Sequence, residues 1–273
     1  MMNRRRFTIL AALSAGLGAI ACSQAKVPSA SVTSIPPANA SEPTVELTVS
    51  VAASVQDAMK DIQAAYQETA PKVTITYNFG SSGSLAQQIA QGAPVDVYLS
   101  ASPQWMDDLA AKGEILDGSR QALLQNALVL VVPQSKTEVV SFPDLSTDSV
   151  GKVAIGEPES VPAGRYAKEA LASLDLFDSI QSKLVFAKDV RQVLAYVETG
   201  NVDAGLVYAT DAQLSDQVQS IAIAPAETHA PIIYPIAVVQ DSDAQAAAIA
   251  FVDFLSSDTA TAIFQDYGFD PAN

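Results

Sequence analysis

The chain has almost none of the residues from which disulfides and transition-metal sites are built. Its 273 residues include a single cysteine, Cys22, and a single histidine, His229. A disulfide framework needs paired cysteines, and zinc or haem sites need clusters of Cys and His, so the sequence offers neither, and no metal cation is expected. A Cys–His nucleophilic pair would have to use these two residues, but Cys22 lies in a segment without core-forming composition.

Basic residues are also scarce. The chain has 15 Lys and Arg against 30 Asp and Glu, which gives a formal charge of -15 at pH 7. Proteins that bind nucleic acid neutralise phosphates with clusters of Lys and Arg, so no nucleic-acid partner is expected. An acidic surface also repels small anions at long range. Any anionic ligand would therefore have to be held by short-range donors in a pocket.

The composition that remains is typical of a folded chain. Hydrophobic residues make up 49% of the sequence and charged residues 16%, and the apolar positions fall in short periodic runs. The length permits one large domain with a substantial core. It equally permits an export signal followed by two modest α/β domains.

The N-terminus has the pattern of a secretory signal. Arg4, Arg5 and Arg6 precede an apolar run over residues 7–21, which is too short to span a bilayer comfortably. The same arginines, followed by Phe7, resemble the twin-arginine export pattern, but a simple basic head gives the same letters, so the export route stays open. Removal of these three arginines would change the formal charge from -15 to -18.

Ala19-Ile20-Ala21-Cys22 resembles a bacterial lipoprotein processing site, in which the cysteine becomes the acylated first residue. We interpret residues 1–22 as the signal peptide with this site, and residues 23–44, rich in Ser, Ala and Pro, as a flexible tether. The expected location is periplasmic or otherwise extracytoplasmic, with a lipid on Cys22 as the only membrane attachment. The usual pattern has leucine in place of Ala19, so cleavage after Ala40 and an unmodified Cys22 are the alternatives.

From Val45 onward, β-rich runs alternate with helical patterns, which predicts βα units around mainly parallel sheets. Strands are predicted at residues 45–51, 73–77, 95–100, 127–132, 153–155, 184–186 and 204–208, and residues 231–239 are interpreted as the crossing back into the first lobe. The expected fold is α/β with two doubly wound lobes. Residues 45–126 and 232–273 would form the first lobe and residues 127–231 the second.

Several helices are predicted to begin just after a strand, where unpaired N–H groups and the helix dipole favour anions. Ser54 and the Gly-Ser loop at residues 80–84 are the sharpest examples. A serine before a helix is more often only an N-cap, and Asp57, three positions after Ser54, completes a capping-box pattern.

No catalytic motif is present in the same segments. The loop at residues 80–84 is not a nucleophile elbow, whose second glycine would fall at Ser84, and it is not a Walker loop, since no Gly-Lys-Ser/Thr follows. Asp107 and Asp108 lie in a helical pattern typical of a solvated face. We therefore expect a binding protein without a cofactor, not an enzyme.

Short segments spread over residues 45–269 resemble, in order and spacing, the periplasmic molybdate-binding proteins of ABC transporters. The segments are VAAS at 51–54, FGSSGSLA at 79–86, GAPVDV at 92–97, VPAGRYA at 161–167, KDVR at 188–191, GLVY at 205–208, YPIAVV at 234–239 and YGF at 267–269. The resemblance implies a type II periplasmic-binding-protein fold, with the ligand in a cleft between the lobes that closes by hinge motion.

The resemblance also implies the ligand-binding residues, which are Ser54, Ser82, Ala163, Val190 and Tyr208. The two serines would each give a hydroxyl and a backbone N–H, Ala163 and Val190 would give backbone N–H groups, and Tyr208 would give its phenol. No basic side chain would contact the ligand.

A pocket made only of hydrogen-bond donors suits a fully deprotonated tetrahedral dianion such as molybdate, tungstate or sulfate. Phosphate near neutral pH carries a proton that would lack an acceptor there, at a cost of about 1–3 kcal/mol. Gly80 and Gly83 stand where relatives often have Ala or Ser, which is expected to loosen the loop around Ser82.

The expected function is high-affinity binding of molybdate, and of tungstate, by a monomer that delivers the oxyanion to an ABC transporter permease. The alternatives are a binding protein for sulfate, thiosulfate or another small solute, or an enzyme or receptor on the same scaffold.

Overall fold

The structure is a computed structural model that describes residues 44–136 and 138–272. The predicted export segment, Cys22 and residues 23–43 of the predicted tether lie outside the described residues.

One sheet, which defines the first lobe, has six strands in the order β11-β4-β10-β3-β1-β2. The strands are β1 (Val45–Ala52), β2 (Val73–Gly80), β3 (Val97–Leu99), β4 (Gln121–Gln125), β10 (Ile233–Val238) and β11 (Asp270–Pro271). The helices of this lobe are α1 (Gln56–Thr69), α2 (Ser82–Ala90), α3 (Pro103–Ala111), α8 (Gln245–Leu255) and α9 (Asp258–Asp266). Strand β1 pairs in parallel with both β2 and β3, so two βα units share this sheet.

The second sheet, in the second lobe, has five strands in the order β7-β6-β8-β5-β9. The strands are β5 (Leu128–Pro133), β6 (Val153–Gly156), β7 (Leu184–Ala187), β8 (Ala204–Tyr208) and β9 (Val218–Ile223). The helices are α4 (Pro162–Ser173), α5 (Phe177–Ile180), α6 (Val190–Glu198) and α7 (Ala209–Gln213). Strand β6 pairs in parallel with β7 and β8.

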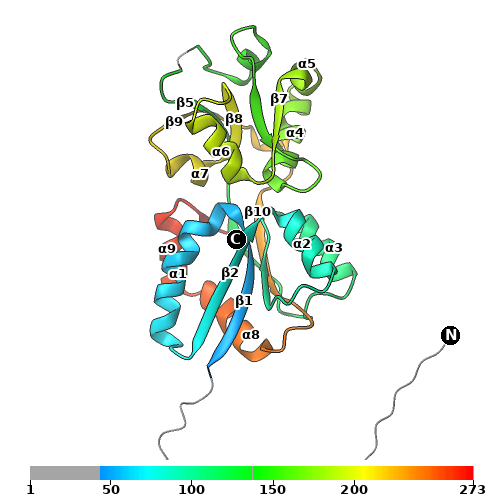
Figure 1. The fold of residues 1–273 in the computed structure, drawn as a ribbon, viewed down its shortest axis with the longest axis vertical. Coiled ribbons are helices and arrows are strands. Elements are labelled where there is room, and N and C mark those ends of the chain that lie inside the picture. The colour runs from blue at the N-terminus through cyan, green and yellow to red at the C-terminus, as the bar shows by residue number, and fades with distance from the viewer. Residues whose placement is uncertain (1–43, 137, 273) are drawn as a thin grey trace, which may run out of the picture. The chain divides into compact units, whose positions relative to one another are not determined.

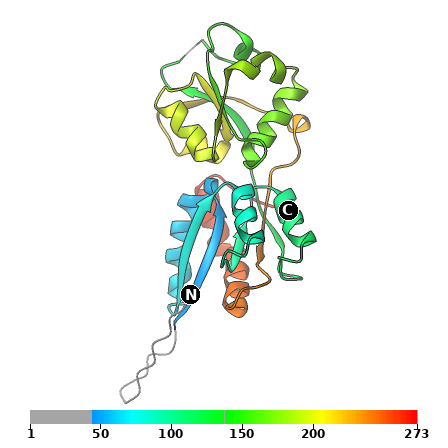
Figure 2. The same ribbon diagram turned by 45° about the vertical axis from the view of Figure 1, so that its right-hand side comes forward.

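The chain passes between the two sheets through the β4–β5 and β9–β10 connections, which run between the lobes in Figures 1 and 2. The predicted two-lobed α/β fold is confirmed. The βα units run parallel, as predicted, whereas β5 and β10, the first strand after each crossing, pair antiparallel with both of their neighbours. Strands β4, β9 and β11 were not predicted, and the crossing expected at residues 231–239 contains strand β10.

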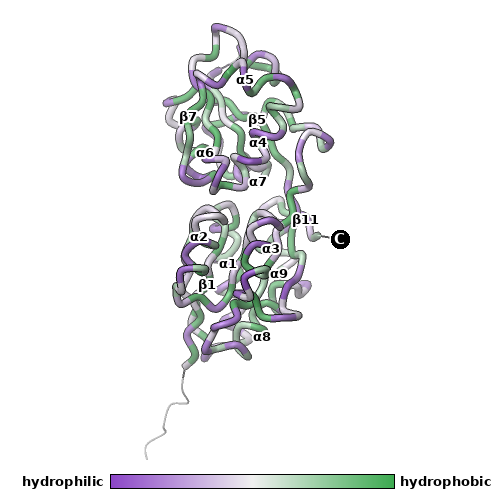
Figure 3. The backbone as a smooth tube through the Cα atoms, turned by 90° about the vertical axis from the view of Figure 1, so that its right-hand side faces the viewer, coloured by the Kyte–Doolittle hydropathy of each residue, from purple (hydrophilic) through white to green (hydrophobic). Residues whose placement is uncertain are grey.

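The core of each lobe follows the hydrophobic pattern of the sequence. Leu47, Val49 and Val51 alternate on β1 and are completely buried, and all four residues of β6 are buried, as expected for a strand covered on both faces. In Figure 3 hydrophobic segments run through the inside of each lobe, where strands such as β5 lie. Both sheets are therefore packed on a hydrophobic core of buried side chains.

Among the described residues no single helix is long and apolar enough to cross a bilayer, although the pair α8 and α9, bent by 60°, passes the test by length and composition alone.

Candidate functional site

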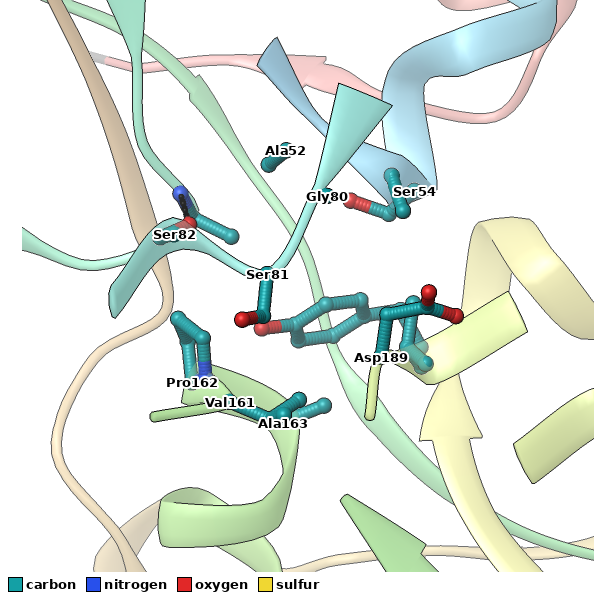
Figure 4. A pocket seen from close by; sticks show the side chains of 13 residues that line it. Ala52, Ser54, Gly80, Ser81, Ser82, Val161, Pro162, Ala163 and Asp189 are labelled. Carbon is teal, nitrogen blue, oxygen red and sulfur yellow. Dashed lines mark hydrogen bonds between the residues drawn. The ribbon is translucent and has the colours of Figure 1, made fainter. Parts of the chain in front are cut away.

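A pocket lies between the ends of the two sheets, with about 210 Å³ of empty space (Figure 4). Its lining comes from both lobes and consists of Ala52, Ala53, Ser54, Gly80, Ser81, Ser82, Ala101, Val161, Pro162, Ala163, Asp189, Val190 and Tyr208. No lysine or arginine is among these described residues.

Ser54 enters this pocket from the first lobe. It is buried in a 3-10 turn, Ala53–Val55, between β1 and α1, and its Oγ lies 3.0 Å from the hydroxyl of Tyr234. The capping role expected for Ser54 is wrong, because Val55 is the N-cap of α1 and no side chain caps that helix. The Ser54 hydroxyl, which the local sequence pattern assigned to the start of α1, instead contacts Tyr234 on β10.

Ser82 enters from the same lobe as the first residue of α2. Its Oγ accepts a hydrogen bond from the backbone N–H of Ala101 at 2.9 Å, and its carbonyl accepts one from the hydroxyl of Tyr98 at 2.8 Å. The predicted loop is shorter than expected, since β2 runs to Gly80 and Ser81 caps α2 by accepting from the N–H of Ser84. The backbone donor holds the Ser82 oxygen in place and leaves the serine proton for the pocket.

At Gly83 the backbones of the two lobes are in contact. Its N–H donates to the carbonyl of Ser160, in the second lobe, at 2.9 Å, and a Cβ at this position would lie 2.5 Å from that carbonyl oxygen. Gly80 has ordinary space, with a would-be Cβ 3.4 Å from the side chain of Leu85. The geometry gives Gly83 a role in close approach and does not indicate a loosened loop.

The second lobe contributes two helix N-termini. Ala163 is the second residue of α4 and Val190 the first of α6, and both are buried. N–H groups in a first helical turn have no intrahelical acceptor, and the helix dipole adds positive potential there. Asp189 also lines the pocket, but it caps α6 by accepting from the N–H of Gln192 at 2.8 Å.

Tyr208 ends β8 and is 1% exposed. Its hydroxyl is buried and has no hydrogen-bond partner within the described residues. Burial raises the pKa of Tyr208 well above its ordinary value, so the phenol keeps its proton and is a neutral donor. A buried donor without a partner is costly, and a bound acceptor would remove that cost.

Charged groups join the lobes beside the pocket. Arg191, on α6, forms ion pairs with Asp57 on α1 and, at 2.9 Å, with the fully buried Asp211 on α7. Arg165, on α4, donates to the hydroxyl of Ser102 at 2.6 Å. Burial raises the pKa of Asp211 to about 7, although Arg191 acts in the opposite direction.

The structure brings all five residues expected from the resemblance to one pocket. Cys22, the expected lipidation site, lies outside the described residues. Sequence reasoning missed the contact of Ser54 with Tyr234 and the ion pair of Asp57 with Arg191, each of which joins residues more than a hundred positions apart. In the described part of the chain, no group of three or more His, Cys, Asp or Glu side chains could hold a metal ion.

Comparison with known proteins places the chain among transport proteins. Residues 47–270 match the model of the family described as bacterial extracellular solute-binding protein. A provisionally named ABC transporter substrate-binding lipoprotein of Bacillus subtilis, YvgL, is 47% identical over 230 residues, which cover 84% of this chain and 88% of the relative. The molybdate-binding protein ModA of Escherichia coli is 40% identical over 229 residues, or 82% and 88% of the two chains.

A solved structure agrees with these relatives. The substrate-binding domain of a provisionally assigned molybdenum ABC transporter from Clostridium difficile is 42% identical, with a TM-score of 0.67 over 84% of this chain and all of that one. The match of the family model over most of the chain, together with the two-lobed fold, shows that this protein belongs to the bacterial extracellular solute-binding protein family.

Proposed function

We propose that the protein binds molybdate, and also tungstate, outside the cytoplasm and delivers it to the permease of an ABC transporter. The observation that carries this proposal is the donor set of the pocket. The hydroxyls of Ser54, Ser82 and Tyr208 and the first-turn N–H groups at Ala163 and Val190 meet there, and no basic side chain lines the pocket.

Such a pocket favours ligands that carry no protons of their own. A tetrahedral dianion without protons accepts hydrogen bonds on every oxygen, so it is satisfied by donors on all sides, and the dipoles of these neutral donors stabilise its charge. A singly protonated phosphate would leave its own hydroxyl without an acceptor, at a cost of about 1–3 kcal/mol. The carboxylate of Asp189 is the exception in the lining, and one of its oxygens, Oδ1, accepts from the N–H of Gln192 at the start of α6.

Contacts across the pocket support capture by closure. The lobes meet through Gly83 and Ser160, through Ser102 and Arg165, and through an ion pair, and these contacts lie beside the pocket. In our proposal the open protein binds the oxyanion, the lobes close about the crossing connections, and the closed form docks on the permease. No bond is made or broken, so the protein acts as a monomeric carrier without a cofactor and not as an enzyme.

The proposed location rests on the N-terminal sequence. Ala19-Ile20-Ala21-Cys22 resembles a lipoprotein processing site, and the Bacillus subtilis relative is named a lipoprotein. A lipid on Cys22 and a tether up to residue 44, with lobes at 45–126 plus 232–273 and at 127–231, would leave the binding unit free to move near its permease. Replacement of Cys22 by serine should release the protein from membranes, and a membrane-bound Cys22→Ser variant would contradict the anchor.

The proposed ligand is tested by thermal unfolding of the protein in the presence of molybdate, tungstate, sulfate or phosphate. A ligand at a hundred times its Kd adds about 2.7 kcal/mol to stability, which is readily seen as a higher Tm. Molybdate and tungstate should raise the Tm most, and Ser54→Ala should reduce the effect of both. A larger shift with sulfate would favour the sulfate alternative, whereas a larger shift with phosphate would refute the donor-only pocket.

A further inference from the structure

The Ser54 hydroxyl can donate to a dianion only if its proton points into the pocket, and neighbouring hydrogen bonds determine where that proton points. The Ser54 Oγ and the hydroxyl of Tyr234 lie 3.0 Å apart, and the distance alone allows either oxygen to be the donor. The direction follows from the groups behind Tyr234.

The first of these groups is a backbone amide. The N–H of Ala127 donates to the side chain of Asn126 at 2.9 Å, and because a backbone N–H has only a proton to offer, the Asn126 atom facing it is the carbonyl Oδ1. The amide nitrogen Nδ2 of Asn126 must then face the other way. It lies 2.9 Å from the hydroxyl of Thr210 and 3.3 Å from the hydroxyl of Tyr234, so its two protons serve these two oxygens.

Tyr234 therefore receives a proton from Asn126 and has to place its own proton elsewhere. Tyr234 is 0% exposed, and its hydrogen bonds within the described residues are those to Asn126 and Ser54. The nitrogen of Asn126 cannot accept, so the phenol donates to Ser54. Burial raises the pKa of Tyr234 well above its ordinary value, so the phenol does not lose the proton.

We propose that this relay from Ala127 through Asn126 and Tyr234 fixes the Ser54 hydroxyl as a donor toward the pocket, which makes Asn126 and Tyr234 positioning residues that select against protonated oxyanions. The proposal rests on the proposed function for its class of ligand. Ser82 needs no relay, because the N–H of Ala101 already donates to its oxygen directly. The hydroxyl oxygens of Ser54 and Ser82, the two serines proposed to bind the ligand, are thus both held through a backbone proton, directly at Ser82 and through two side chains at Ser54.

Reversal of the relay is the sharpest test. In an Asn126→Asp variant, the carboxylate can still accept from Ala127, but its second oxygen would accept from Tyr234. Tyr234 would then accept from Ser54, and lone pairs of Ser54 would face the pocket. Singly protonated phosphate would gain an acceptor there, while molybdate would lose a donor.

The readout is the Kd of phosphate divided by the Kd of molybdate. Both are measured by competition at mildly alkaline pH, where phosphate is a singly protonated dianion. The added charge acts equally on two dianions and cancels in the ratio. Asn126→Asp is expected to lower the ratio at least about tenfold, the equivalent of one hydrogen-bonding group changing from unpaired to paired. Tyr234→Phe, which leaves Ser54 without a fixed direction, is expected to lower it by less.

Gln125→Glu is the matched control, because it adds the same charge one residue away, on β4 and outside the relay. Its ratio should stay at the wild-type value. An unchanged ratio in Asn126→Asp, or an equal change in Gln125→Glu, would overturn the proposal, since loss of stability or added charge would then explain the result.

Neutron diffraction of the deuterated protein separates this proposal from the proposed function. The relay requires the Tyr234 deuteron to lie toward Ser54 Oγ, and a Ser54 deuteron lying toward Tyr234 would overturn it. If the wild-type protein bound none of the oxyanions, the proposed function would fail, and the neutron map would still decide the direction of the relay.

Discussion

The close contact of Gly83 with the backbone of the other lobe predicts the effect of a Gly83→Ala substitution, and Gly80→Ala is its control. In Gly83→Ala the new methyl group would lie 2.5 Å from the carbonyl oxygen of Ser160 and 2.6 Å from the ring of Trp105, where real Cβ contacts are essentially never below 3.0 Å. The Trp105 ring, on the same lobe, is a side chain that can shift. The Ser160 oxygen belongs to the backbone of the other lobe, so the lobes have to separate.

The magnitude follows from the cost of overpacking, which is about 1–3 kcal/mol for an added methylene in a packed interior. Because the clash exists only when the lobes are in contact, the cost falls on the closed arrangement and appears as a loss of affinity of about 5- to 150-fold. The same substitution at Gly80 puts the methyl group at an ordinary 3.4 Å from Leu85, so Gly80→Ala should lose far less affinity.

Isothermal titration with molybdate measures both variants, and the thermal unfolding of the ligand-free proteins shows whether either lobe is damaged. We expect Gly83→Ala to bind weakly while its ligand-free Tm changes little. The double variant Gly83→Ala/Trp105→Ala separates the two contacts. If the double variant regained full affinity, or if Gly83→Ala bound as tightly as Gly80→Ala, the interlobe explanation would be refuted.

Three further outcomes follow from the charges of the molecule. Because burial raises the pKa of Asp211 to about 7, the folded protein holds this proton more tightly than the unfolded chain does, and its stability should fall as the pH rises from about 4 to 7. The Tm of Asp211→Asn should therefore exceed the Tm of the wild type by more at pH 8 than at pH 5. A difference in Tm that is the same at both pH values would count against the raised pKa. The acidic surface should slow the arrival of molybdate, so the association rate in stopped-flow mixing should rise with salt, and a fall would show local steering by donors or cations. Asp57→Asn removes the interlobe ion pair with Arg191 and should weaken molybdate binding by about 2- to 5-fold, as expected for a partly exposed pair. The control Lys60→Gln removes only the partner of Asp57 on the same helix and should leave the affinity unchanged. Equal losses of affinity in both variants would exclude the interlobe pair as the cause.

The sequence predicted elements where local pattern and burial agree. Residues 204–208 were predicted as a strand and form β8 with the same bounds, because an apolar run in the centre of a sheet is buried at every position. Strand β4 begins and ends with glutamine, and β9 lies at a sheet edge with half-exposed positions, so neither has a pattern that stands out from its surroundings.

The site shows the same division between local and distant information. The resemblance identified five residues that line one pocket, and in the proposed function two of them, Ala163 and Val190, bind through backbone N–H groups that their apolar side chains do not reveal. The interpretation of Ser54 as a cap was wrong because its partner, Tyr234, is 180 positions away in the sequence. The ion pair of Asp57 with Arg191 spans 134 positions and is equally invisible to local patterns. Contacts between segments that are distant in the sequence have no local signal.

The central claim is that neutral donors from both lobes surround one tetrahedral dianion, and a crystal structure grown with molybdate tests it most directly. Anomalous scattering locates molybdenum without ambiguity. The account predicts one molybdenum site in the pocket, with its oxygens within hydrogen-bonding distance of the hydroxyls of Ser54, Ser82 and Tyr208 and of the N–H groups of Ala163 and Val190. A molybdenum site elsewhere, or one held by a lysine or arginine side chain, would contradict it.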